Sequence, residues 1–261
     1  MSVFIVCAML LGSAGQDSRA TQAHAEESKD KQESPAAGDR EQETPSVLPG
    51  MGSVSTTLYT LNAPPPGFDG KAMPLLKPKK GMQGWTDIDG KATDWTIDED
   101  GVVHATDRDV MTEMAFGDCQ LHIEYSLPQT PGRIGSAAAT SGVVIQGRYE
   151  IELHNSFGRP PSRMSAGAIR GAVAPIANAS LPAPGWQALD VYFKAPLIED
   201  GKVVRPAMMT ALLNGVLILN NVEITAPTDA AIGTDMPAMG PLVLQGSPDQ
   251  VHFRNIWIRR P

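Results

Sequence analysis

The chain has 261 residues, a formal net charge of −8 and two cysteines. Residues 67–261 are long enough for one β-sandwich or barrel domain to bury a full core. Much of the negative charge lies in residues 26–66, which contain seven acidic and three basic side chains. The rest is only mildly acidic, which argues against a surface that binds the phosphate backbone of nucleic acids.

An apolar stretch, residues 3–15, begins the chain. It is shorter than the roughly 20 helical residues that span a bilayer, and it is typical of a signal-peptide core, although no Lys or Arg precedes it. Ala23 and Ala25 supply an A-x-A cleavage pattern before a charged run. We therefore predict a signal peptide over residues 1–25 and a secreted or periplasmic protein with no membrane span after cleavage.

Cys7 falls within this signal, so the mature protein keeps Cys119 alone and has no internal disulfide. Cys119 is expected to be a small buried hydrophobe. Residues 26–66 are rich in Glu, Lys, Gln, Ser and Pro and poor in large apolar residues. Such a composition cannot bury enough surface to fold, which predicts a disordered acidic linker before a single domain over residues 67–261.

Short runs with alternating or continuous apolar residues recur along residues 67–261. They are residues 102–106, 120–127, 142–153, 189–195, 208–219, 241–246 and 251–258. Clusters of Gly, Pro, Asn and Asp separate them, and the pair Asn214-Gly215 is a strong two-residue hairpin signal. No segment sustains a period of 3.6 residues. The pattern predicts an all-β, antiparallel protein.

Alternation assigns side chains to faces, because successive residues of a strand point to opposite sides of its sheet. Two sets are expected in the core: Leu121, Ile123 and Tyr125 from one strand, and Tyr149, Ile151 and Leu153 from another. The opposite sets are polar: Gln120, His122 and Glu124, and Arg148, Glu150, Glu152 and His154. We predict that the two polar rows form one exposed, concave, charged surface.

Glu150 and Glu152 are two residues apart on one predicted strand, so their Cα atoms lie about 6.7 Å apart. At an effective dielectric constant near 20, two charges at that distance repel by about 2.5 kcal/mol, which raises the pKa of one carboxyl unless a cation compensates. Such a pair is suited to acid–base catalysis on sugars, or to binding of a divalent metal ion. The alternative, a merely solvated strand face, stays open at this stage.

Several blocks of the sequence resemble the 3-keto-disaccharide hydrolase family. The central block is SGVVIQGRYEIELHNSFG at 141–158. Others follow in the family's order: GW at 84–85, DWTIDEDGVV at 94–103, FGDCQLHIEY at 116–125, GAI at 167–169, an AP-x-x-NAS block at 174–180, GWQ at 185–187, LNGVLI at 213–218, PLVLQG at 241–246 and VHFRNIWIRR at 251–260. Together they cover nearly all of residues 67–261.

The resemblance implies a concanavalin-A-like jelly-roll sandwich of two antiparallel sheets that cleaves glycosidic bonds of 3-keto sugars by removal of the C2 proton and β-elimination. On this basis we expect the catalytic groups to be Glu150, Glu152, His154 and His122. The expected substrate-binding residues are Gln146, Arg148, Trp186 and Arg254. A divalent metal ion, if present, is expected on Glu124, Glu150 and Glu152. Arg254 and Asn255 are adjacent on one strand, so only one of them should line the cleft.

The chain departs from the family's pattern at several positions. Glu152 and His154 stand where relatives commonly have Gln and Asp, and Leu213 stands where they often have His. Gly246 and Ser247 replace a frequent Asp-His pair. Loss of catalysis would leave a carbohydrate-binding jelly-roll module, which is the second hypothesis. A laminarinase-type glycosidase is a third, but it needs a further carboxylate where this chain has Asn155 and Ser156.

Limited proteolysis tests the proposed linker. Residues 26 to about 64 should be trimmed rapidly, because their composition cannot form a protected core, and a resistant fragment should begin near Gly67. Mass spectrometry of the fragments identifies the boundary. Uniform protection of residues 26–64 would show that they are folded.

Overall fold

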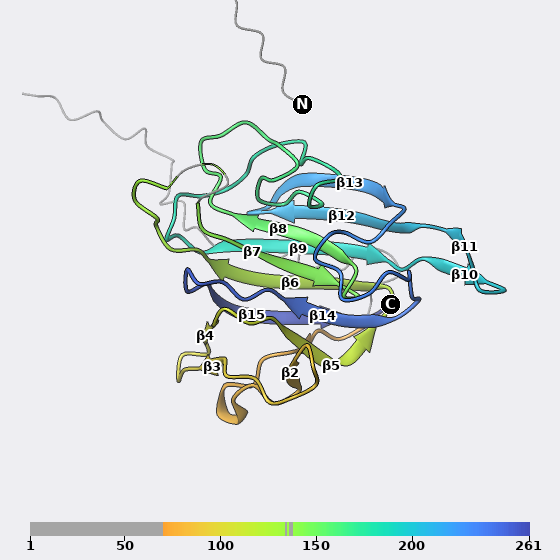
Figure 1. Ribbon diagram of the computed structural model, residues 1–261, viewed down its shortest axis with the longest axis horizontal. Helices are drawn as coiled ribbons and strands as arrows, with labels where there is room; N and C mark the ends of the chain where they lie inside the picture. Colours follow the sequence, from red (N-terminus) through yellow and green to blue (C-terminus); the bar gives the residue numbers. More distant parts are fainter. Residues whose placement is uncertain (1–69, 134, 136–137) are drawn as a thin grey trace, which may run out of the picture. The chain divides into compact units, whose positions relative to one another are not determined.

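The computed structural model describes residues 70–133, 135 and 138–261. The expected signal peptide and linker lie outside these residues. The described part is built from antiparallel strands and one short 3₁₀ helix, η1 (Pro78–Lys80), and it contains no α-helix (Figure 1). The prediction of an all-β protein is confirmed. None of the described residues belongs to a helix long and apolar enough to cross a membrane.

Most strands belong to two sheets. The eight-stranded sheet has the order β13 (Val216–Ile224), β12 (Ala207–Leu213), β9 (Gln187–Lys194), β6 (Cys119–Ser126), β15 (His252–Arg259), β4 (Val103–His104) and β3 (Thr96–Ile97), with β1 (Met73–Pro74) also paired to β15. The five-stranded sheet has the order β2 (Trp85–Asp87), β5 (Val110–Phe116), β14 (Gly240–Leu244), β7 (Thr140–Ile145) and β8 (Tyr149–His154). Strands β10 (Leu197–Glu199) and β11 (Lys202–Arg205) form a separate hairpin.

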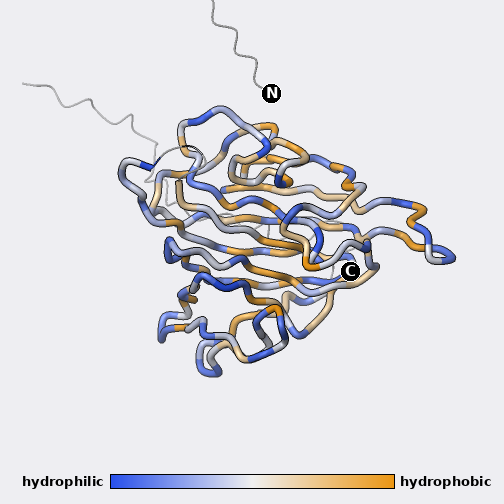
Figure 2. Tube along the Cα trace, viewed as in Figure 1, coloured by the Kyte–Doolittle hydropathy of each residue, from blue (hydrophilic) through white to orange (hydrophobic). Residues whose placement is uncertain are grey.

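The core lies between the two sheets. Tyr149 of β8 meets Phe193 of β9 across it, with ring centroids 5.5 Å apart. The predicted inward residues of β6 and β8 are all buried there, namely Leu121, Ile123, Tyr125, Tyr149, Ile151 and Leu153. Cys119 is buried as well. Hydrophobic colour runs along the strands, and hydrophilic colour gathers at the connecting loops (Figure 2). The fold is a concanavalin-A-like jelly-roll sandwich.

Two tight turns define hairpins. Asn214 and Gly215 join β12 to β13 with positive φ angles of 52° and 79°, which confirms the predicted turn. The apolar run at 142–153 forms the hairpin β7–β8. Gln146 and Gly147 turn the chain there with φ angles of 55° and 62°. Arg148 therefore precedes β8 rather than belonging to it.

The predicted single polar surface is wrong. Glu150, Glu152 and His154 lie on the outer face of the five-stranded sheet, opposite the core-facing Tyr149. His122 and Glu124 lie on the outer face of the eight-stranded sheet, where β6 is flanked by β9 and β15. The two rows thus belong to different sheets and point away from each other. Alternation gave the correct face within each strand, but it carries no information on which sheet a strand joins.

Truncation of a core residue tests this arrangement. Ile123→Ala should lower the free energy of unfolding by about 2–5 kcal/mol, because Ile123 is fully buried between the sheets and its loss leaves a cavity. Urea denaturation measures the change. The control Val204→Ala, at a residue 52% exposed on β11, should stay within about 0.5 kcal/mol of the wild type. Equal effects of the two variants would contradict the assigned core.

Candidate functional site

Glu150 and Glu152 form the centre of the candidate site on the outer face of β8. They are buried, not exposed as predicted, because two loops cover this face. Residues 167–170 run along β8: the Glu152 N–H donates to the Ala168 carbonyl at 2.9 Å, and the Arg170 N–H donates to the Glu150 carbonyl at 3.2 Å. From the second loop, the Thr228 hydroxyl accepts from the Glu150 N–H at 3.0 Å.

Arg170 joins the two carboxylates. Its Nη1 donates to Oε2 of Glu152, and its Nε lies 3.7 Å from Oε2 of Glu150. The Thr140 hydroxyl donates to the other oxygen of Glu152. Each carboxyl oxygen of Glu152 therefore has a partner.

Glu150 has a different environment. Neither of its carboxyl oxygens has a hydrogen-bond partner among the described residues, and the residue is fully buried. Burial, and next the charge of Glu152, raise the pKa of Glu150 to about 7, against the opposing effect of Arg170. A buried carboxyl that titrates near neutrality is a candidate acid or base.

Gly142, opposite Glu152 on β7, makes room for the neighbouring Glu150 carboxyl. A Cβ atom on Gly142 would lie 2.7 Å from Oε1 of Glu150 and 2.3 Å from Oε1 of Gln245. Gln245 and Glu150 thus share the space above a residue that lacks a side chain. A larger residue at position 142 would displace both polar groups.

A pocket of about 370 Å³ opens beside Glu152 and Arg170, a size that accommodates a small ligand. It is lined by Gly135, Thr140, Glu152, His154, Ser156, Arg159, Pro160, Ser162, Met164, Ser165 and Arg170. Arg170 also lines two adjoining depressions that contain Asp229. Its side chain is 30% exposed, in contrast to the two buried carboxyls that it contacts.

His154 lines the same pocket, and its hydrogen bonding fixes its tautomer. Nε2 lies 3.0 Å from the Gly135 carbonyl oxygen, which can only accept, so Nε2 carries the proton. In the neutral form of the ring, Nδ1 then has a free lone pair. It has no partner among the described residues, although it is buried.

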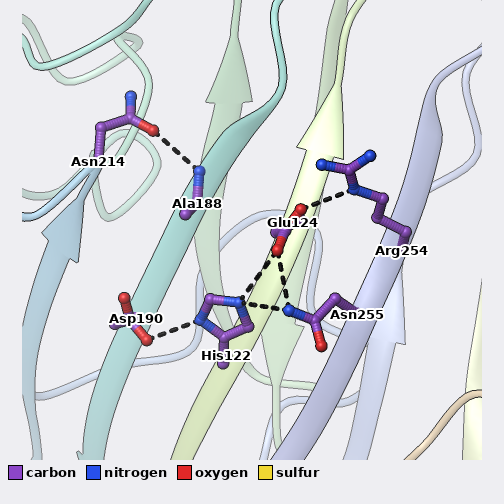
Figure 3. Close-up of polar contacts among 7 residues, drawn as sticks. All are labelled: His122, Glu124, Ala188, Asp190, Asn214, Arg254 and Asn255. Atoms are coloured by element: carbon purple, nitrogen blue, oxygen red, sulfur yellow. Dashed lines mark hydrogen bonds and ion pairs between the residues drawn. The ribbon is translucent and has the colours of Figure 1, made fainter. Parts of the chain in front are cut away.

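A second polar cluster lies on the outer face of the eight-stranded sheet (Figure 3). His122 Nδ1 lies 2.8 Å from Oδ1 of Asp190, and the Asn255 amide lies 3.2 Å from Nε2. Arg254 and Asn255 donate to the two oxygens of Glu124 at 2.6 and 2.8 Å. Burial opposes a charge on His122, but Asp190 and Glu124 outweigh it and raise the His122 pKa to about 9. Hydrogen bonding from His122 is the main cause that lowers the Glu124 pKa to about 2.

The expectation that Arg254 and Asn255 point to opposite faces is wrong. Strand β15 changes register between Arg254 and Trp257, and Asn255 has a φ of 47°, so a β-bulge brings both side chains to Glu124. Arg254 also lies over the ring of Trp186, 4.0 Å from its centroid. These residues meet one another, but they do not join Glu150 and Glu152.

Two further predicted binding residues donate hydrogen bonds away from the candidate site. Gln146 is buried, and its amide donates to the carbonyls of Phe116 and Ala238 at 3.1 and 3.0 Å. Arg148 pairs with Asp235. Both therefore hold the β7–β8 turn against the loop before β14. Arg170 is the residue that sequence reasoning missed, although it directly follows the GAI block at 167–169.

The three carboxylates expected to hold a metal ion cannot do so together, because Glu124 lies on the other sheet. No group of three or more His, Cys, Asp or Glu side chains in the described part of the chain is arranged to hold a metal. The residues present therefore do not fit the expected set of ligands.

The environment of Glu150 predicts a pH-dependent stability. A carboxyl whose pKa is raised on folding stabilises the fold below its unfolded pKa, 4.5, and that stability is lost as pH rises through about 7. The raised pKa corresponds to a contribution of roughly 3 kcal/mol at most to the free energy of unfolding. Glu150→Gln removes this titration, so its stability relative to the wild type should increase between pH 5 and pH 8. Urea unfolding of both proteins tests this, and parallel pH curves would contradict it.

Comparison with known proteins identifies the family of this chain. Residues 68–259 match the family model described as the 3-keto-alpha-glucoside-1,2-lyase-like domain. No curated protein sequence matches the chain. A crystal structure of a "putative glycosyl hydrolase" from Parabacteroides distasonis is 29% identical, with a TM-score of 0.64 over 73% of this chain and 84% of that one.

A second protein of the same organism and description is 17% identical, with a TM-score of 0.56 over 74% of this chain and 94% of that one. At this identity the likeness supports the fold alone. The family match covers most of the chain. The chain belongs to the 3-keto-alpha-glucoside-1,2-lyase-like domain family, a family of carbohydrate-active proteins.

Proposed function

We propose that this chain is an exported enzyme that cleaves the glycosidic bond of 3-keto-glycosides by β-elimination, with Glu150 as the base. The observation that carries the proposal is the fully buried Glu150 carboxyl, which has no hydrogen-bond partner on either oxygen among the described residues. Natural proteins rarely leave a buried carboxyl unpaired without a functional reason. Export follows from the expected signal peptide over residues 1–25.

The reaction follows from the ketone of the substrate. A C3 carbonyl acidifies the C2 hydrogen, so the Glu150 carboxylate can take that proton while the C2–H electrons form an enolate. The enolate then expels the C1 substituent with its bonding electrons, which leaves a C1=C2 double bond conjugated to the ketone. Addition of water across that bond, with oxygen at C1 and hydrogen at C2, completes net hydrolysis. A base whose pKa is about 7 is well matched to this task near neutral pH.

Arg170 supplies the cation that the enolate needs. It covers Glu150, and it is already held beside it by Glu152. Access to Glu150 requires that the partly exposed guanidinium turn from the carboxyl toward the substrate. There it would donate to the C3 oxygen as negative charge develops, which is stabilisation that grows toward the transition state.

The adjoining pocket provides polar groups for sugar hydroxyls. Thr140, Ser156, Ser162 and Ser165 contribute hydroxyls to its lining, and Nδ1 of His154 can accept a hydrogen bond. Such a wall of mixed donors and acceptors suits a ring with many hydroxyl groups.

Release of the aglycone from a 3-keto-glucoside tests the proposal. Glu150→Gln should lower turnover by about a hundredfold or more, since Gln keeps the shape but cannot accept the proton. The control Glu199→Gln, on the exposed β10 hairpin, should keep full activity. Both variants should be folded by circular dichroism.

Near-wild-type turnover by Glu150→Gln would exclude Glu150 as the base. If the wild-type protein releases no aglycone from any 3-keto-glycoside but binds glycans, the chain is a carbohydrate-binding module. The unoxidised parent glucoside should remain intact in either case, because it lacks the acidic C2 hydrogen.

A further inference from the structure

We propose that the pocket beside Glu152 binds a sugar unit that carries a carboxylate, as in a uronic acid, with Arg159 as the group that recognises it. This inference deepens the proposed function and rests on it for the role of the pocket. It is based on the charges of the pocket wall, on an unpaired guanidinium and on the free nitrogen of His154.

The pocket has an excess of positive charge. Two guanidinium groups, those of Arg159 and Arg170, line it, and Glu152 is the one carboxylate among its described lining residues. Glu152 and Arg170 pair with each other, so their charges largely cancel. Arg159, an exposed residue, has no second carboxylate to pair with among the described lining residues.

The backbone of Arg159 is fixed while its guanidinium is unpaired. Its N–H donates to the Ser156 carbonyl at 3.1 Å, and its carbonyl accepts from the Asn178 amide at 2.8 Å. Within the described ranges, no acidic or hydrogen-bonding partner is present for the guanidinium. An arginine anchored in this way is suited to bidentate binding of a planar carboxylate.

His154 adds a polar group to the pocket lining. It is 8% exposed, it lines the pocket, and its Nδ1 lone pair has no partner in the described part of the chain. A lone pair accepts from a hydroxyl, so it complements a sugar ring rather than an isolated anion.

Gly135 brings these two groups together. His154 Nε2 bonds to the Gly135 carbonyl, and Arg159 Nη1 lies 3.5 Å from the position that a Cβ of Gly135 would take. The His154 ring, through Nε2, and the Arg159 guanidinium therefore both lie beside Gly135. A sugar acid presents both complementary groups on one ring.

Isothermal titration calorimetry of the full chain tests this without requiring turnover. The probes are methyl α-glucuronoside, methyl α-glucoside and methyl α-glucoside 6-sulfate. The wild type should bind the glucuronoside at least about tenfold more tightly than the neutral glucoside, as expected for a charge-assisted contact. Arg159→Gln should abolish this preference. The matched control Arg163→Gln, at an exposed arginine outside the pocket lining, should retain it.

Equal affinity for the glucuronoside and the glucoside, or an unchanged preference in Arg159→Gln, would overturn the proposal. So would no detectable binding of the glucuronoside up to about 10 mM. Tighter binding of the 6-sulfate would overturn the assignment of a carboxylate. Turnover of neutral 3-keto-glucosides without a preference for the glucuronoside would refute this inference alone. A glucuronoside preference without turnover of any 3-keto sugar would refute the proposed function alone.

Discussion

Two carboxylates on alternate residues of one buried strand cannot both be ionised without a compensating cation. The repulsion of about 2.5 kcal/mol that their spacing implies grows when water is excluded. The structure resolves this conflict asymmetrically. Arg170 and Thr140 contact both oxygens of Glu152, whereas Glu150 has no hydrogen-bond partner among the described residues and its pKa rises to about 7. One strand therefore carries a carboxyl with a partner on each oxygen and, two residues away, a carboxyl that titrates near neutral pH.

This asymmetry depends on the loops around β8. Arg170 lies beside Glu150 because residues 167–170 hydrogen-bond along the edge of the strand. The loop near Thr228 covers the other side of Glu150.

At position 246 the backbone of residues 107–108 approaches so closely that a Cβ would lie 2.5 Å from it, and Asp109 accepts from the Gly246 N–H. A side chain such as the relatives' Asp would not fit there without a shift of the backbone.

Features that depend on residues close together in the chain were predicted correctly, whereas features that depend on contacts between distant segments were not. The alternation of β6 and β8 identified their buried faces, and Asn214-Gly215 identified a hairpin, because both signals are local. Strand order is not local, so His122 was wrongly joined to Glu150. A bulge of β15 reversed the expected direction of one side chain in the Arg254-Asn255 pair. Arg170 was missed because a loop residue has no periodicity to reveal it.

The two polar clusters differ in how completely their hydrogen bonds are satisfied. On the eight-stranded sheet Nδ1 of His122 bonds to Asp190, Nε2 forms an ion pair with Glu124, and both oxygens of Glu124 accept hydrogen bonds, as Figure 3 shows. A saturated network of this kind rigidifies a sheet and leaves little for a ligand to bind. On β8, by contrast, Glu150 and His154 keep polar atoms without partners among the described residues. A ligand that supplied the missing contacts would offset the desolvation cost of those atoms. This is the physical reason to propose the site on the five-stranded sheet.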